Sequence, residues 1–326
     1  MKICLLDPGI EDNNQYPSAN LGDLIIQESI NREIINIFGQ QDIIRFSTHV
    51  PLENEHFKVL NTCSIILVGG TNLLSSYMNR YNQWKIWIND ALRLKRAILL
   101  GVGWWQYQGN PNLYTKILLR SALSRKAIHS VRDNYSKVKL QSLGINNVVN
   151  TVCPTMWPLI SCRDQDIPHE KSENVLLMLT DYSKNIELDI KLIELLLFNY
   201  KKVFVWPQGR GDIKYISGMN VTVTMLEHSL EALDKFIGSG IAFDYIGTRL
   251  HGGIRCLVSR KRSLILEIDN RAKEIASDTG LPTSERSDFD YISQWINGQT
   301  VTKIKIDPVP IKQWKSQFNV ENKNLF

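Results

Sequence analysis

Short apolar stretches alternate with longer amphipathic ones along almost the whole chain, and this alternation constrains the fold more than any other feature. KICLLD, DIIRFS and SIILVGG are apolar runs of strand length, and segments between such runs, for example residues 20–38, carry apolar residues at helical spacing. Strands that alternate with helices predict a doubly wound, mostly parallel sheet. In such a sheet, ligands bind outside the carboxyl ends of the strands.

The alternation is interrupted once, which predicts two domains. Residues 155–173, TMWPLISCRDQDIPHEKSE, are rich in proline and charge, as expected of an interdomain linker. The 326 residues also exceed the length at which a single core usually stops growing. We therefore predict an α/β protein with two Rossmann-like domains that face each other across a cleft. They span residues 1–157 and 158–300, and the tail at 301–326 either packs back on the first domain as an amphipathic helix or is solvated.

Composition limits the possible classes of function. The net charge of +5 is mild and the Lys and Arg residues are scattered, which argues against nucleic-acid binding and fits anionic small molecules. Five cysteines without C-x-x-C spacing indicate a reduced protein. No apolar run approaches the roughly 18 residues of a membrane span, and the first run is too short for a signal peptide. We expect a cytoplasmic protein with at most peripheral contact at the inner face of a membrane.

Residues 243–257, FDYIGTRLHGGIRCL, form an apolar strand that runs into a helix opening with Arg249 and His251. Side chains two positions apart on a helix point about 200° from each other, so both can serve one site only in the first turn. Thr248 as N-cap and Arg249 as first helical residue would allow this. Taken alone, a histidine is more often a structural residue than a functional one.

Two earlier turns have residues suited to a ligand. NLGD opens a helix after the first strand, where Asn20 and Asp23 could cap backbone N–H groups or bind a ligand, or could merely start the helix. LVGG is followed by Thr71 and Asn72, and a glycine such as Gly70 lets a ligand approach the backbone.

Three further motifs end apolar strands. In VRD, Arg132 could hold a carboxylate or phosphate with two hydrogen bonds, or could form a surface pair with Asp133. In WPQGRGD, Gln208 could face the cleft or be solvated. GVGWW lacks the third glycine of a dinucleotide fingerprint, and Trp104 and Trp105 could stack on a sugar or fill the core.

The familiar metal and phosphate motifs are missing. The sequence has no H-E-x-x-H, no paired C-x-x-C and no Walker loop. Two D-x-D segments, at 164–166 and 288–290, do not directly follow apolar strands and are interpreted as solvated acids. We therefore expect no metal and no bound cofactor.

The order NLGD, strand-GG, G-x-G, VRD and TRLHG resembles the polysaccharide pyruvyl transferase family over roughly residues 3–276, and TRLHG is the most specific part. The resemblance implies a fold like that of glycosyltransferases of the B type. It also implies transfer of an enolpyruvyl-derived unit from phosphoenolpyruvate, a co-substrate, to two hydroxyls of a sugar. The product is a pyruvate ketal on a precursor of exopolysaccharide, capsule or cell wall.

The resemblance implies that Arg249, His251 and Arg132 contact the donor. A carboxylate and a phosphate need more than one fixed cation at a metal-free site, and His251 is the best candidate for the acid that protonates the donor. Asp23 and Asp244 are the candidate bases, with Asp23 at the better placed turn. The other expected donor contacts are Gly70, Thr71, Asn72 and Gln208. The expected acceptor contacts are Asn20, Asp23, Trp104 and Trp105. The first domain would hold the acceptor and part of the donor site, and the second would hold the donor.

The chain departs from the family pattern at two places. It reads GGTNLLS where many members have a third glycine and some an acid, and Cys153 precedes Pro154 where Asp-Pro is common. The base and the acceptor, which could be free, nucleotide-linked or lipid-linked, therefore stay unassigned. Two alternatives remain: a nucleotide-sugar-dependent glycosyltransferase with the same fold, and a non-catalytic sugar-binding relative.

Overall fold

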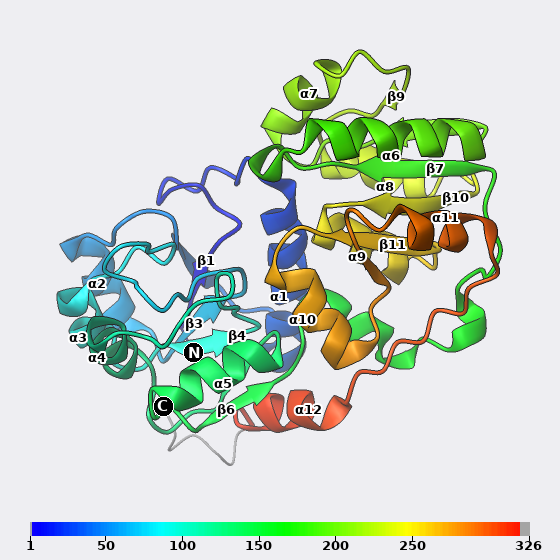
Figure 1. Ribbon diagram of the computed structural model, residues 1–326. Coiled ribbons are helices and arrows are strands. Elements are labelled where there is room, and N and C mark those ends of the chain that lie inside the picture. The colour runs from blue at the N-terminus through cyan, green and yellow to red at the C-terminus, as the bar shows by residue number, and fades with distance from the viewer. Residues whose placement is uncertain (1, 320–326) are drawn as a thin grey trace. The chain divides into compact units, whose positions relative to one another are not determined.

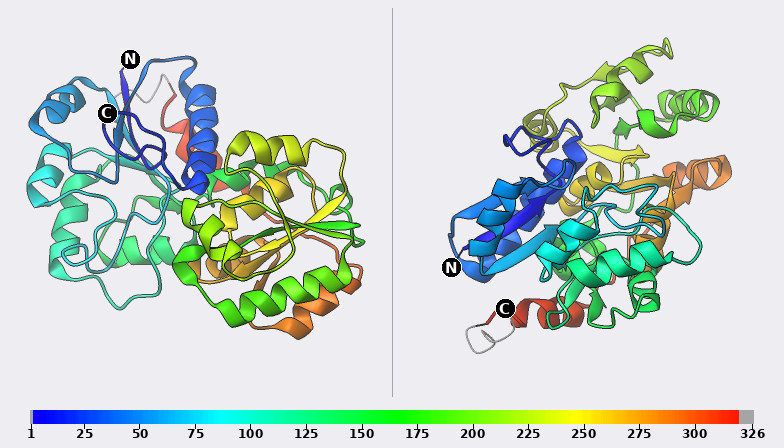
Figure 2. Two further views of the ribbon diagram at one scale, coloured as in Figure 1. Left: turned by 90° about the horizontal axis from the view of Figure 1, so that it is seen from above. Right: turned by 90° about the vertical axis from the view of Figure 1, so that its left-hand side faces the viewer.

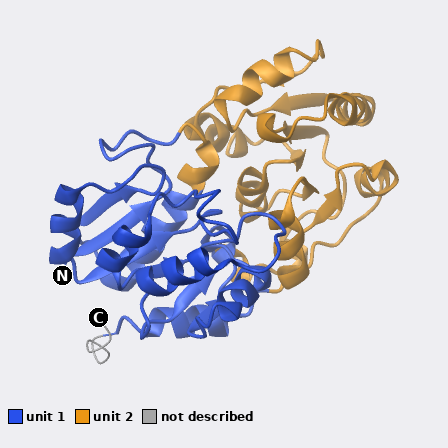
Figure 3. Cartoon of the chain, turned by 60° about the vertical axis from the view of Figure 1, so that its left-hand side comes forward, with its two compact units in different colours: residues 1–18, 26–157, 306–326 blue, residues 19–25, 158–305 orange. Residues whose placement is uncertain are grey.

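The computed structural model describes residues 2–319 and divides the chain into two compact units (Figure 3). Among the described residues, unit 1 comprises residues 2–18, 26–157 and 306–319, and unit 2 comprises Ala19–Ile25 and Pro158–Lys305. Residues 19–25, which the sequence places in the first domain, are thus grouped with unit 2. The sheets of both units are parallel, which confirms the predicted α/β class.

Unit 1 contains a four-stranded sheet of order β2-β1-β3-β4 and a separate β5-β6 pair (Figure 1). The strands are β1 (Ile3–Asp7), β2 (Ile43–Ser47), β3 (Ile65–Gly69), β4 (Ile98–Leu100), β5 (His129–Val131) and β6 (Val148–Asn150). The helices are α1 (Leu21–Phe38, residues 21–25 being grouped with unit 2), α2 (Asn54–Thr62), α3 (Ile88–Leu94), α4 (Leu113–Ala122), α5 (Asn134–Ser142) and α12 (Pro308–Ser316). One core joins side chains of α2, α3, α4 and α5 to β1, β3 and β4. Every residue of β1 and β3 is buried, as expected for parallel strands covered on both faces.

Unit 2 contains a six-stranded sheet of order β12-β11-β10-β7-β8-β9. The strands are β7 (Asn174–Met178), β8 (Lys202–Val205), β9 (Thr224–Met225), β10 (Phe243–Gly247), β11 (Ser263–Glu267) and β12 (Thr283–Glu285). The helices are α6 (Ile186–Asn199), α7 (Arg210–Ser217), α8 (Leu230–Ile237), α9 (Leu250–Val258), α10 (Asn270–Thr279) and α11 (Phe289–Asn297). Helices α6, α7 and α11 pack on one face, and helices flank both faces of the sheet (Figure 2). The chain leaves β7 towards β8 and returns to β10 on the other side, so the carboxyl ends of β7 and β10 flank the topological switch point.

Asp244, one of the two candidate bases, has a structural role. It lies near the start of β10, where its carboxylate accepts from Arg262 Nη1 at 2.9 Å and from the hydroxyl of Tyr200 at 2.7 Å. All three side chains are buried, and burial raises the pKa of Asp244. The carboxylate lies away from the carboxyl edge of the sheet and is occupied by its partners, so the suggestion that it acts as the base was wrong.

Several local elements differ from those expected. Neither α7 nor β12 was predicted from the apolar pattern. Residues 83–87 are not helical, and α3 begins at Ile88, since Lys85 N–H bonds to Thr48 O at 3.0 Å. The segment expected to be a plain linker contains two 3₁₀ helices, Pro154–Ser161 and Asp164–Asp166. Within unit 1, α12 packs through the fully buried Trp314, whose ring lies edge-on to Trp157 at 6.4 Å. None of the helices in residues 2–319 is long and apolar enough to cross a membrane.

His129 makes the stability of the protein depend on pH. The fully buried ring accepts from Leu99 N–H at 3.3 Å and contacts Ser124 O at 2.9 Å, so one nitrogen accepts and the other donates. Burial lowers the pKa of His129 from 6.5 to about 4. The unfolded chain therefore takes up a proton that the folded chain does not, and the free energy of unfolding falls by about 3 kcal/mol as pH drops from 6.5 to 4.

Urea unfolding measured across this pH range tests the prediction. His129→Gln keeps one donor and one acceptor but cannot titrate, so its stability should change less with pH than that of the unsubstituted protein. His169→Gln makes the same substitution at a half-buried surface position and is the control for the change of side chain. Equal pH dependence in His129→Gln and the unsubstituted protein would contradict the assignment.

Candidate active site

The first turn of α9 begins at the switch point of unit 2. Thr248 N–H bonds to Met178 O at 2.8 Å, which ties the end of β10 to the end of β7. Arg249 is the N-cap of α9, with φ −91° and ψ 98°, and His251 is the second helical residue. The expected cap, Thr248, was therefore wrong by one position. Arg249 and His251 nevertheless both lie in the first turn, as a shared site requires.

A buried ion pair with Asp212 fixes the guanidinium of Arg249. Its Nε donates to Asp212 Oδ2 at 3.0 Å and to Leu179 O at 3.2 Å, and its Nη2 donates to Asp212 Oδ1 and, at 3.3 Å, to Asp181 Oδ1. Arg249 is 3% exposed and Asp212 is fully buried. Burial raises the pKa of Asp212, and Arg249 opposes this rise. The hydrogen-bond partners of the guanidinium are held by Nε and Nη2, and Nη1 has no hydrogen bond to another described residue.

Asp212 also organises the loop after β8. Its Oδ2 accepts from the backbone N–H of Gln208 at 3.1 Å and of Gly209 at 2.8 Å, and its Oδ1 accepts from Asp181 N–H at 2.9 Å. Sequence reasoning singled out Gln208 in WPQGRGD and missed Asp212. An acid three positions after a helix-capping glycine is a recognisable start of a helix, and it could have revealed both Asp212 and α7.

The NLGD turn bonds to this loop within unit 2. Gln208 donates from Nε2 to Asn20 Oδ1 at 3.2 Å, and its backbone O accepts from Leu21 N–H at 3.0 Å. Asn20 donates from Nδ2 to Asp23 Oδ2 at 3.0 Å. Gly252 N–H, in the first turn of α9, donates to Gln208 Oε1 at 3.2 Å. The structure thus brings three predicted residues, Asn20, Asp23 and Gln208, into one network with the helix that carries His251.

Two glycines allow the close packing of α9. A Cβ on Gly252 would lie 2.3 Å from Met178 Sδ, and a Cβ on Gly253 would lie 2.5 Å from the ring of Tyr245. Real Cβ atoms do not approach so closely, so only glycine permits the first turn of α9 to lie against β7 and β10. This explains the pair of glycines that follows His251.

Unit 2 also contains a second arginine that sequence reasoning did not assign to the site. Arg271, just after β11, donates from Nη2 to the hydroxyl of Tyr182 at 2.5 Å and pairs with Asp269 at 2.6 Å. The Tyr182 ring centre lies 5.0 Å from the guanidinium carbon of Arg249 and 5.9 Å from that of Arg271. The position of Arg271 beyond the carboxyl end of a strand was the available signal.

Arg132 belongs to a separate cluster in unit 1. It is 1% exposed, donates from Nε to Asp133 Oδ2 at 3.1 Å, and donates from Nη2 to Asn72 Oδ1. The pair with Asp133 is therefore buried and not a surface pair. A Cβ on Gly103 would lie 2.2 Å from the guanidinium carbon of Arg132, so the glycine makes room for it. The structure brings together Arg132 and Asn72, two of the expected donor contacts.

The turn after β3 has a packing role as well. A Cβ on Gly70 would lie 2.4 Å from Gly101 O, so this glycine is required by the neighbouring strand whether or not a ligand approaches. Thr71 is half-buried, and its carbonyl accepts from Gly103 N–H at 2.8 Å. The backbone of Thr71 thus joins the turn to the glycine that accommodates Arg132.

The two tryptophans of GVGWW have different environments. Trp104 is fully buried in the core of unit 1, so it fills the core and the idea that it contacts the acceptor was wrong. Trp105 is half-buried and stacks on Tyr81 with ring centres 3.8 Å apart and an interplanar angle of 24°. Trp105 therefore remains the candidate for a sugar-stacking wall.

No group of three or more His, Cys, Asp or Glu side chains in residues 2–319 is arranged to hold a metal ion. In the first D-x-D segment, Asp166 forms an ion pair with Arg163 at 3.0 Å. In the second, Asp288 caps α11 by accepting from Tyr291 N–H at 3.0 Å.

Comparisons with known proteins bear on the family and on the fold. A family model described as polysaccharide pyruvyl transferase matches residues 20–270, and a comparison with curated proteins finds no match. Among solved structures, the chain is similar to UDP-GlcNAc 2-epimerase from Methanocaldococcus jannaschii in complex with UDP-GlcNAc and UDP, with a TM-score of 0.55 and 12% identity over 97% of each chain. Another structure of that epimerase has a TM-score of 0.53 and 11% sequence identity, over 94% of this chain and 95% of that chain. This likeness shows the fold alone and confirms the predicted glycosyltransferase-B-like type.

The buried pair gives a prediction about stability. Asp212→Asn removes the fully buried carboxylate that balances Arg249, so we expect the free energy of unfolding to fall by about 3 kcal/mol or more. Asp234→Asn is the matched control. Asp234, on α8, accepts two hydrogen bonds from Arg255 of α9, but its side chain is 49% exposed. The control substitution should lower the free energy of unfolding by about 1 kcal/mol or less. Equal losses in the two variants, measured by urea unfolding, would contradict the prediction.

Proposed function

The chain belongs to the polysaccharide pyruvyl transferase family, and we propose that it transfers an enolpyruvyl-derived unit from phosphoenolpyruvate to two hydroxyls of a sugar, forming a pyruvate ketal. The observation that carries this proposal is the first turn of α9, where the pair with Asp212 positions Arg249 one residue before the helix and His251 at its second residue. A cation, an imidazole and the positive end of a helix in one turn suit an anionic donor that must be protonated.

The donor carries a carboxylate and a phosphate, and the residues of unit 2 fit both charges. Nη1 of Arg249 can donate to one of them, and the guanidinium carbon of Arg271 lies 5.9 Å from the centre of the Tyr182 ring, which is 5.0 Å from that of Arg249. Charge-assisted hydrogen bonds from fixed guanidinium groups hold such anions without a metal. In unit 1, Arg132 is proposed as a further donor contact, as the family resemblance implies, together with Asn72, which accepts a hydrogen bond from it.

The proposed chemistry balances with His251 as acid and Asp23 as base. His251 gives a proton to the methylene carbon of the donor, which becomes a methyl group and leaves C2 electrophilic. The first sugar hydroxyl adds to C2 and gives its proton to Asp23, which passes it to the departing phosphate as the C2–O bond to phosphate breaks. The second hydroxyl then adds to C2 and returns a proton to His251. Both residues end the cycle as they began it.

The acceptor is proposed to be a sugar of a glycan precursor for exopolysaccharide, capsule or cell wall, either free or linked to a nucleotide or lipid. The ring of Trp105, backed by Tyr81, would stack on its apolar face, and Asn20 would bind its hydroxyls. We place the reaction in the cytoplasm, where the five free cysteines would stay reduced.

Purified protein incubated with phosphoenolpyruvate and a panel of sugars should release phosphate and form a ketal. Arg249→Lys keeps the charge but loses the fork that serves both Asp212 and the donor, so we expect kcat/KM to fall by about 100-fold or more. Arg255→Lys is the matched control, since it makes the same change in a two-bonded pair at the other end of α9, and it should retain activity.

Three results would count against this function. Absence of both phosphate release and ketal across the panel overturns it. Full activity of Arg249→Lys would contradict the proposed role of the first turn of α9 in donor binding. Binding of a uridine nucleotide without any binding of phosphoenolpyruvate favours the alternative, a nucleotide-sugar-dependent glycosyltransferase.

Trp105 gives a prediction that separates acceptor from donor. Trp105→Ala removes the stacking surface, so we expect KM for the sugar to rise by about 10-fold while KM for phosphoenolpyruvate stays the same. Trp87→Ala, at a 47% exposed position in unit 1, is the control and should change neither value. A rise in KM for phosphoenolpyruvate instead would place Trp105 on the donor side.

A further inference from the structure

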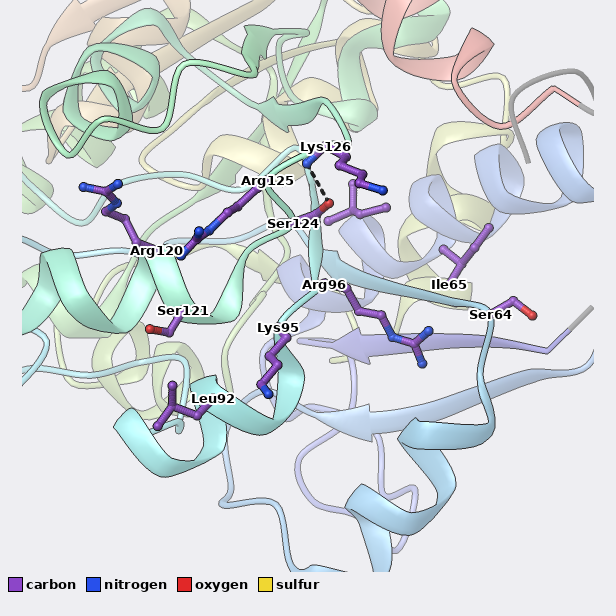
Figure 4. A pocket seen from close by; sticks show the side chains of 11 residues that line it. Ser64, Ile65, Leu92, Lys95, Arg96, Arg120, Ser121, Ser124, Arg125 and Lys126 are labelled. Carbon is purple, nitrogen blue, oxygen red and sulfur yellow. Dashed lines mark hydrogen bonds between the residues drawn. The ribbon is translucent and has the colours of Figure 1, made fainter. Parts of the chain in front are cut away.

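A cavity of about 470 Å³ opens at the amino-terminal edge of the unit 1 sheet (Figure 4). Ile65 and Ile98, the first residues of β3 and β4, lie on its wall, and the ends of α3 and α4 and the segment leading into β5 complete it. Its volume lies within the range of about 300–1,000 Å³ found for small-molecule sites. Gly70 follows the opposite end of β3, so the cavity is distinct from the proposed donor contacts of this unit.

The lining of the cavity is strongly basic. It contains five cations and no carboxylate, and the cations are Lys95, Arg96, Arg120, Arg125 and Lys126. None of the five forms an ion pair with an acidic side chain anywhere in residues 2–319. Unbalanced like charges around a concavity repel one another and create a positive potential that an anion would relieve.

Helix capping explains only part of this charge. Lys95 is the C-cap of α3 and Arg120 lies in the last turn of α4, where cations stabilise the helix end. Arg125 and Lys126 are exposed in the loop after α4 and cap nothing. Arg120 and Arg125 also line an adjoining cavity of about 190 Å³, so the basic surface continues beyond the first. Arg96 donates from Nη2 to Leu60 O at 3.3 Å and to Cys63 O at 2.5 Å, so it also serves the end of α2. Arg125 and Lys126 have no such role, which favours a ligand at this surface.

We propose that this cavity is a second ligand site of the protein and binds a diphosphate group. Five cations exceed what one phosphate needs, and arginine forks match phosphate oxygens two at a time. Ile65 and Ile98 on the wall and Leu92, 47% exposed, offer apolar contact to the remainder of the ligand. The diphosphate belongs either to a soluble compound or to a lipid headgroup at a membrane surface.

Isothermal titration of the full chain at low ionic strength tests the proposal, with excess phosphoenolpyruvate present to occupy the proposed donor site. Inorganic pyrophosphate should bind the unsubstituted protein, and the double variant Arg120→Gln, Arg125→Gln should bind about 10-fold more weakly or worse. The matched control is Lys116→Gln with Arg80→Gln, which removes two positive charges from the same unit, one of them on α4, outside the cavity. The control should bind pyrophosphate like the unsubstituted protein.

A second arm identifies the source, using phosphatidylcholine vesicles with and without diacylglycerol diphosphate. Binding of pyrophosphate without vesicle binding supports a soluble ligand, and vesicle binding that requires both the diphosphate lipid and Arg120 and Arg125 supports a headgroup. Equal weakening in the cavity and control variants, or no binding of either probe, overturns the proposal. Loss of pyrophosphate binding in Arg249→Lys, with full binding in the cavity variant, also overturns it, because the probe would then lie at α9.

Discussion

The buried ion pair between Arg249 and Asp212 is the interaction on which the site in unit 2 depends. Removing two charges from water is costly, and the pair persists because neighbouring groups complete its hydrogen bonds. Asp212 accepts three backbone N–H groups from the ends of β7 and β8, and Arg249 donates to the carbonyl of Leu179. The pair therefore holds together the loops that follow β7, β8 and β10. These contacts position the first turn of α9.

Topology explains why these loops meet. β7 and β10 are neighbours in the sheet, but the chain after β7 leads to β8 on one side and the chain after β10 leads to β11 on the other. The two connections therefore separate and leave room above the carboxyl ends of these strands. Arg249 follows β10 and Asp181 lies beyond β7, and both enter the space at this switch point. Unit 1 has its own reversal between β1 and β3, and the turn after β3 holds Asn72 against Arg132.

The sequence predicted what depends on local pattern and missed what depends on distant contacts. Apolar runs located nearly every strand, and the TRLHG motif located Arg249 and His251. The grouping of the NLGD turn with unit 2 could not be predicted, because it rests on contacts such as that between Asn20 and Gln208, 188 positions apart. Trp104 and Trp105 likewise look alike in the sequence, and only the packing around them separates a core residue from a half-buried one.

The network around Gln208 couples the proposed base to the helix that carries the proposed acid. Gly252 N–H donates to Gln208 Oε1, Gln208 donates to Asn20 Oδ1, and Asn20 donates to the carboxylate of Asp23. Every bond points the same way, from the positive end of α9 to a negative charge, so each amide polarises the next. The same bonds determine how the side-chain amides of Gln208 and Asn20 are oriented. Exchanging the oxygen and nitrogen of either amide would place two donors or two acceptors against each other. Glutamate in place of Gln208 would put a carboxylate oxygen against Asn20 Oδ1 and break the chain at its centre.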